Sequence, residues 1–165
     1  MSIRRSEIER FSVISFKPFE AVMDALKAGV GQLDLAEFEK ASHSTATFSE
    51  LESVVNRRDP GRTGLMLFIE MDHGAVLRKE SGLKTPKIVR LVVGNPLIMK
   101  EMAIRVSDAG SYAPVTILVD ERSDGVRLSY DMMVSLLTPY GNPDALKVAQ
   151  DLDLKVEELL NNAAA

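Results

Sequence analysis

The sequence contains no cysteine and no tryptophan, and aromatic residues make up only 5% of its 165 residues. Without cysteine, disulfides, thiolate metal sites, iron–sulfur clusters and cysteine nucleophiles are all excluded. The low aromatic content leaves few surfaces on which bases or sugars could stack. These absences remove several large classes of enzyme and binding protein before any motif is considered.

Net positive charge and long apolar runs are also lacking. Twenty lysines and arginines against 24 aspartates and glutamates give a net charge of −4, which is the wrong sign for gripping a phosphate backbone. No stretch approaches the roughly 20 apolar residues of a membrane helix, and charged residues stand where a signal peptide needs an apolar run. We therefore expect a cytoplasmic protein that binds neither nucleic acid nor membrane.

What is present is the composition of a globular domain, with 45% hydrophobic and 27% charged residues. A chain of this length can bury about 70% of the surface that its unfolded form exposes. Glycine and proline occur singly between the predicted helices and strands, and no linker or low-complexity segment divides the chain. We expect residues 1–165 to form a single domain.

Capping residues predict where the helices begin and end. Pro18 suits the first turn of an amphipathic helix that Gly29 can end in a left-handed cap. Capping-box spacing occurs twice, from Asp34 and from Thr47, and predicts two shorter helices within residues 34–58.

Three further helices are predicted after these. Asp72 can cap a short helix that Gly82 closes, and Asn95 with Pro96 begins an amphipathic helix ending near Gly110. The same pair, an asparagine cap followed by proline at the first helical position, predicts a C-terminal helix over residues 143–160.

Runs of β-branched and other apolar residues predict four to five strands, at residues 8–15, 64–71, 87–93, 115–121 and 126–130. The nearly continuous apolar run at 64–71 suits a central strand, and Asp124-Gly125 suits a hairpin turn. The order β-α-(αα)-β-α-β-α-β-β-α predicts an α+β fold with a single mixed, largely antiparallel sheet packed against helices.

Four short motifs then follow one another between residues 64 and 130: FIEMDHGA, RLVVGNP, APVTILVDE and DGVRLSYD. Their order and spacing resemble the bacterial family of domains of unknown function DUF302. The resemblance implies a compact α+β fold, a homodimer and no established activity. Residues 64–130 form the family-like core, and the two helices within residues 34–58, which precede it, are interpreted as an insertion.

Polar residues interrupt the apolar strands at three points that match motifs of this family. They are Asp72 with His73, Asn95, and Tyr130 with Asp131. Many members carry cysteine where Gly94 and Val115 stand here, so a thiol or metal role of those members does not carry over.

Our leading hypothesis is a noncatalytic small-ligand-binding or interaction module whose binding residues are these five. It requires the three polar breaks to converge at one rim of the sheet.

Two other hypotheses remain open. The first is an enzyme acting on a small organic acid or a phosphorylated metabolite, with His73 as general base, Asp72 orienting it and Asn95 holding an anion. However, Gly141-Asn142-Pro143 repeats the Gly94-Asn95-Pro96 tripeptide, so helix initiation alone explains that asparagine. The second is a domain that only oligomerises, through the edge of the 115–130 hairpin or the apolar stripe of residues 145–159, although we expect that stripe to pack within its own chain.

Metal and cofactor sites are not expected. The two histidines, His43 and His73, are far apart in the sequence, and no recognised spacing of metal ligands occurs. Glycine-rich phosphate loops and nucleophile elbows are also absent.

Overall fold

The computed structural model describes residues 3, 5–44, 47–57 and 63–165. Six strands form one sheet: β1 (Arg10–Ser15), β2 (Gly31–Gln32), β3 (Met66–Asp72), β4 (Ile88–Gly94), β5 (Val115–Arg122) and β6 (Gly125–Asp131). Their order across the sheet is β1-β6-β5-β4-β3-β2. All neighbours are antiparallel except the parallel pair β2 and β3. The predicted α+β fold with a mixed, largely antiparallel sheet is confirmed, with six strands in place of four to five.

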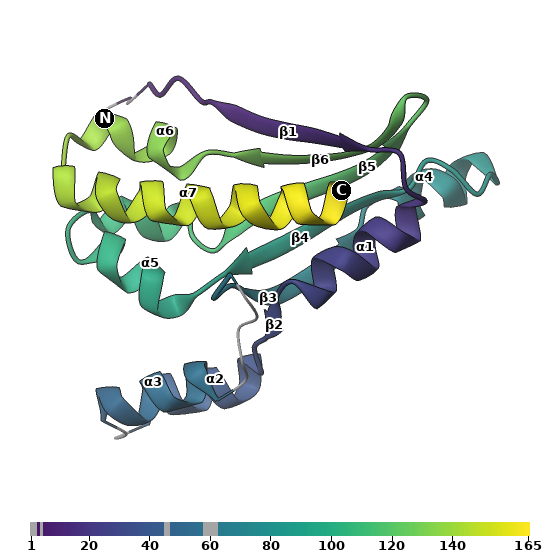
Figure 1. Ribbon diagram of the computed structural model, residues 1–165. Helices are drawn as coiled ribbons and strands as arrows, with labels where there is room; N and C mark the ends of the chain where they lie inside the picture. The colour runs from purple at the N-terminus through teal and green to yellow at the C-terminus, as the bar shows by residue number, and fades with distance from the viewer. Residues whose placement is uncertain (1–2, 4, 45–46, 58–62) are drawn as a thin grey trace.

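Seven α-helices accompany the sheet in the described chain: α1 (Phe19–Ala28), α2 (Leu35–His43), α3 (Phe48–Asn56), α4 (Gly74–Ser81), α5 (Pro96–Ala103), α6 (Met133–Leu137) and α7 (Pro143–Ala164). Single turns of 3-10 helix cover Ser107–Ser111 and Thr138–Tyr140. Helices α1, α5, α6 and α7 lie over one face of the sheet, while α2 and α3 project from one side and α4 lies at the far end (Figure 1).

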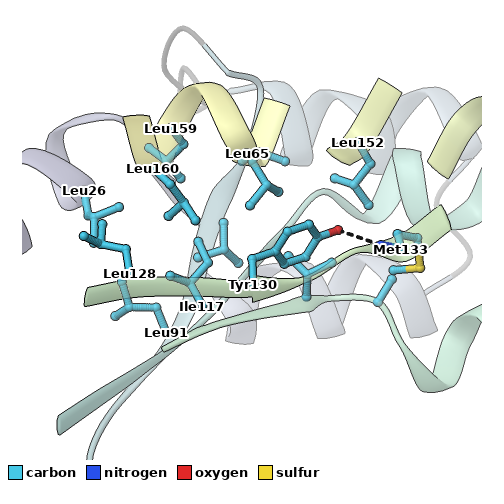
Figure 2. Close-up of a cluster of buried hydrophobic side chains, with 14 of the residues drawn as sticks. Leu26, Leu65, Leu91, Ile117, Leu128, Tyr130, Met133, Leu152, Leu159 and Leu160 are labelled. Atoms are coloured by element: carbon cyan, nitrogen blue, oxygen red, sulfur yellow. Dashed lines mark hydrogen bonds between the residues drawn. The ribbon is translucent and has the colours of Figure 1, made fainter. Parts of the chain in front are cut away.

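The core lies between the sheet and α7. Alternate residues of the central strands are buried, including Leu91, Ile117 and Leu128, because successive side chains of a strand point to opposite faces. Leu152 and Leu160 of α7 close this core from above (Figure 2). The apolar stripe of residues 145–159 therefore packs within its own chain as predicted, and the hypothesis that it serves oligomerisation is wrong.

The β5–β6 hairpin forms as predicted but lies inside the sheet. Strand β5 also pairs with β4, and β6 also pairs with β1. Both edges of the hairpin are therefore occupied by the chain's own strands. The hypothesis that a free hairpin edge mediates oligomerisation is wrong for this reason.

Capping residues place most helix starts correctly. The side chains of Asp34, Thr47, Asn95 and Asn142 each accept a hydrogen bond from the first turn of their helix. Gly82 ends α4 in the left-handed conformation, with φ of 70°, which glycine adopts without a steric penalty. At the other ends, α7 continues four residues beyond the expected Leu160, to Ala164, and α5 stops at Ala103 before the separate 3-10 turn.

Two details of the sequence prediction are wrong. Gly29 has φ of −82° and forms no left-handed cap; a Cβ there would lie 2.5 Å from Leu159 Cδ1, so close packing against α7 accounts for the glycine. The strand predicted as central, β3, lies second from the edge, since β2 pairs only with Met66 and Leu67. From Ile69 onward β3 is largely exposed.

Candidate functional site

The predicted meeting of three polar breaks does not occur. Strands β3 and β4 are antiparallel, with Asp72 opposite Val89 and Met66 opposite Gly94. Asp72 and Asn95 therefore lie at opposite ends of these strands, about 20 Å apart at roughly 3.3 Å per residue. Asn95 and Asp131 do lie at the same end of the sheet, because β4 and β6 run in the same direction with β5 between them.

Asp72 stabilises the start of α4. Its carboxylate accepts hydrogen bonds from Ala75 N at 3.0 Å and from Arg78 Nη2 at 2.5 Å. The Arg78 guanidinium holds the pKa of Asp72 below its ordinary value. His73 is exposed, and no side-chain hydrogen bond to it occurs among the described residues. Asp72 thus does not orient His73 as a general base would require.

Asn95 ties the start of α5 to the start of β3. Its Oδ1 accepts from Leu97 N at 2.8 Å, and its Nδ2 donates to the Gly64 carbonyl at 2.9 Å. Both ends of the amide are therefore engaged in structure. An anion at this helix start would have to displace one of these bonds.

Tyr130 lies in the core beneath α7. Its hydroxyl accepts from Met133 N at 3.1 Å (Figure 2). The same hydroxyl donates to Asp153 Oδ1 at 2.6 Å. Asp153 also accepts from Met133 N and Val134 N, at 2.7 and 3.0 Å. Burial raises the pKa of both Tyr130 and Asp153. Together they anchor the first turn of α6 to α7.

Asp153 was not singled out from the sequence. A signal was present, since Asp153 follows Ala149 by one helical repeat and is a charged residue within an otherwise apolar stripe. Such a residue is buried only with partners.

Asp131 lies on the opposite face of the sheet, which no helix covers in Figure 1. Arg10 donates two hydrogen bonds to the Asp131 carboxylate, from Nε to Oδ1 at 2.6 Å and from Nη2 to Oδ2 at 3.0 Å. This fork forms one wall of a cleft of about 360 Å³. The cleft is also lined by Arg90 of β4, Thr116 and Leu118 of β5, and Leu136 of α6.

Arg90 is the cation of this cleft that lacks a carboxylate partner among the described residues. Its Nη2 donates to Thr116 Oγ1 at 3.0 Å, whereas Arg10 is neutralised by Asp131. Two guanidinium groups against one carboxylate leave the cleft with a net positive charge, although the whole chain carries −4. The sequence signal was a single arginine within the apolar run from Ile88 to Val93.

The described residues offer neither a metal site nor a membrane-spanning helix. In the described parts of the chain, no group of three or more histidine and acidic side chains could hold a metal ion. No helix there is long and apolar enough to span a bilayer.

Comparison with known proteins supports the fold and the predicted family. A crystal structure of an uncharacterised conserved DUF302 protein from Bacillus stearothermophilus superposes with a TM-score of 0.64 at 14% identity, covering 93% of this chain and 97% of that one. No curated protein matches the sequence. The family profile spans residues 43–163, a wider range than the predicted 64–130, and it includes part of the segment predicted as an insertion. The chain therefore belongs to the family of domains of unknown function DUF302.

Proposed function

We propose that this domain is a noncatalytic binding module for a small organic acid, and that the ligand carboxylate pairs with Arg90. The observation that carries the proposal is the position of this guanidinium in a positively charged cleft without a carboxylate partner among the described residues. An arginine fork matches the geometry of a carboxylate and can donate two parallel hydrogen bonds to it.

The surroundings of Arg90 suit such a ligand. The bond to Thr116 holds the guanidinium in place and uses one of its five donors. Val115, Leu118 and Leu136 supply apolar surface for the body of the ligand. A volume of about 360 Å³ falls within the range of small-molecule sites.

Catalysis by His73 has less support. Among the described residues, Asp72 is bound to Arg78 and the first turn of α4 and does not reach back to the imidazole. A general base needs an orienting partner and a nearby substrate site. His73 is not among the residues that line the Arg90 cleft, so we favour binding over catalysis.

Titration calorimetry with hexanoate and benzoate tests the proposal. We expect the wild type to bind at least one of them, with the neutral hexanamide binding at least tenfold more weakly. Arg90→Gln should lower acid affinity at least tenfold, because the charge-assisted bonds are lost. The control Lys147→Gln removes one exposed charge from α7 and should bind as the wild type does. Equal affinities of wild type and Arg90→Gln, or no binding of either acid, would refute the proposal.

We also propose that the domain is a homodimer, as the family resemblance implies, and that its interface is an apolar patch on the uncovered sheet face. The patch consists of Ile69 and Met71 of β3 with Ile88 and Val92 of β4. Arg90 lies between Ile88 and Val92 on the same face, opposite Met71, so a partner chain at this patch would border the acid-binding cleft. Ile69 is 45% exposed and lies opposite Val92 across the strands. Apolar side chains on an otherwise solvated sheet face favour a protein partner.

A further inference from the structure

A second cavity lies where the sheet meets α5, away from the Arg90 guanidinium. It has a volume of about 160 Å³. Its walls come from five parts of the chain. They include Phe38 of α2, Phe68 of β3, Met99 and Met102 of α5, Pro114 just before β5, and Leu152 of α7. The cavity is partly open to solvent, and Pro114 in its wall is exposed. A concave apolar site of this kind suits a small ligand.

The side chains around this cavity offer no free polar group. Asn95 is the one polar side chain among the lining residues, and both ends of its amide are bound, to Gly64 O and Leu97 N. An ordered water needs two to four polar partners, and apolar cavities of similar volume bind benzene. The chemistry of the walls therefore disfavours water and charged ligands alike.

The roof of the cavity belongs to a weakly attached element. Phe38 closes it from α2, a helix that has no fully buried side chain. In Figure 1 the α2–α3 pair projects from the body of the molecule. A small displacement of α2 would widen the opening of the cavity, whereas Met102 and Leu152 in its wall are buried in the core. Methionine side chains can adapt to ligands of differing shape.

We propose that this cavity binds a neutral apolar molecule of about the size of toluene. A volume near that of the dry benzene-binding cavities sets the size, and the carbon and sulfur walls set the chemistry. A helix or a second copy of the chain is too large to enter. Val115 lines both this cavity and the proposed acid-binding cleft, but Arg90 lines only the cleft.

Toluene and methyl-labelled methionine give a direct test, because the chain has eight methionines. Toluene should shift the NMR signals of the Met99 and Met102 methyl groups and leave those of Met23 and Met71, outside the cavity, unchanged. At ten times its dissociation constant it should raise the midpoint of thermal unfolding by about 3 °C. Benzylammonium, which carries a charge, should do neither.

Variants separate this site from the rest of the molecule. Met99→Trp fills the cavity and should abolish the toluene effects, while the control Leu154→Trp, at an exposed position of α7 outside the cavity, should retain them. Arg90→Gln should also retain them, because Arg90 does not line this cavity. The proposal is overturned if no methionine signal moves, if Met23 or Met71 shifts as much as Met99, or if folded Met99→Trp responds like the wild type.

Discussion

At the residue scale, Asp153 is the clearest case of a charge held inside the core. It is 3% exposed, and its two oxygens accept from the Tyr130 hydroxyl and two backbone amides. These bonds favour the charged form, but burial outweighs them and raises the pKa. The folded protein therefore holds this proton more tightly than the unfolded chain does, and the contribution of Asp153 to stability falls as the pH rises above about 4.

Tyr130→Phe should lower the free energy of unfolding by about 1–3 kcal/mol, because a hydrogen bond to a buried carboxylate is lost. The pKa of Asp153 should rise further without this donor. The deficit of the variant should thus grow as the pH rises above about 4. Urea unfolding at several pH values measures it.

Tyr112→Phe is the control for this prediction. It removes the 3.1 Å hydrogen bond between the partly buried hydroxyl groups of Tyr112 and Tyr140. Because no carboxylate takes part, the loss in free energy of unfolding should be smaller than for Tyr130→Phe at every pH. A deficit of Tyr130→Phe that shrinks toward neutral pH would contradict the assignment of the proton to Asp153.

Single residues also show what the sequence could predict. Asn95 and Asn142 were recognised as caps because capping depends only on neighbouring residues. The reason for Gly29 was missed, since its contact with Leu159 joins positions 130 residues apart. Arg90 was missed as a candidate site residue for the same reason, because its cleft exists only once four strands are paired.

At the element scale, α2 and α3 are the part of the described chain least tied to the sheet. No residue of α2 is buried, and Val55 is the one buried residue of α3. Arg57 bonds to Glu37 within this pair of helices. Their caps predicted both helices, whereas β2 and α6 were missed because two and five residues are too short for a periodic pattern.

Replacing residues 35–57 by a short glycine–serine linker should leave the sheet folded. We expect a loss of about 1–3 kcal/mol in the free energy of unfolding, mainly from the contacts of Val55 and Phe38. The amide spectrum of β4, β5 and β6 should be retained.

Ligand binding provides the second measurement on this deletion. Toluene binding should be lost with the Phe38 roof, while hexanoate or benzoate binding at Arg90 should persist, which makes the Arg90 cleft the internal control. Collapse of the amide spectrum to that of an unfolded chain would show that α2 and α3 are part of the folding core.

At the scale of the whole molecule, strand direction explains why the predicted cleft was wrong. Each polar break follows a strand, and the prediction assumed that these strand ends meet. In an antiparallel sheet neighbouring strands finish at opposite ends of the sheet. Asp72 at the end of β3 and Asn95 after β4 are therefore separated by the length of the strands. The class of fold follows from the element pattern, but strand order depends on distant contacts such as those of α7, which local patterns do not encode.

The apolar patch around Ile69 on the uncovered sheet face should mediate self-association. If the patch around Ile69 forms a dimer, light scattering after gel filtration should give twice the mass of one chain at about 100 μM. Ile69→Lys should weaken association at least tenfold, because it places a charge within the apolar interface. Leu154→Lys is the matched control: Leu154 is 63% exposed on α7, in the helical layer, and its replacement should leave the dimer intact. A wild type that stays monomeric would show that the patch forms no dimer. A dimer disrupted by Leu154→Lys and not by Ile69→Lys would place the interface on the helical layer, because only a contact through the uncovered sheet face buries Ile69.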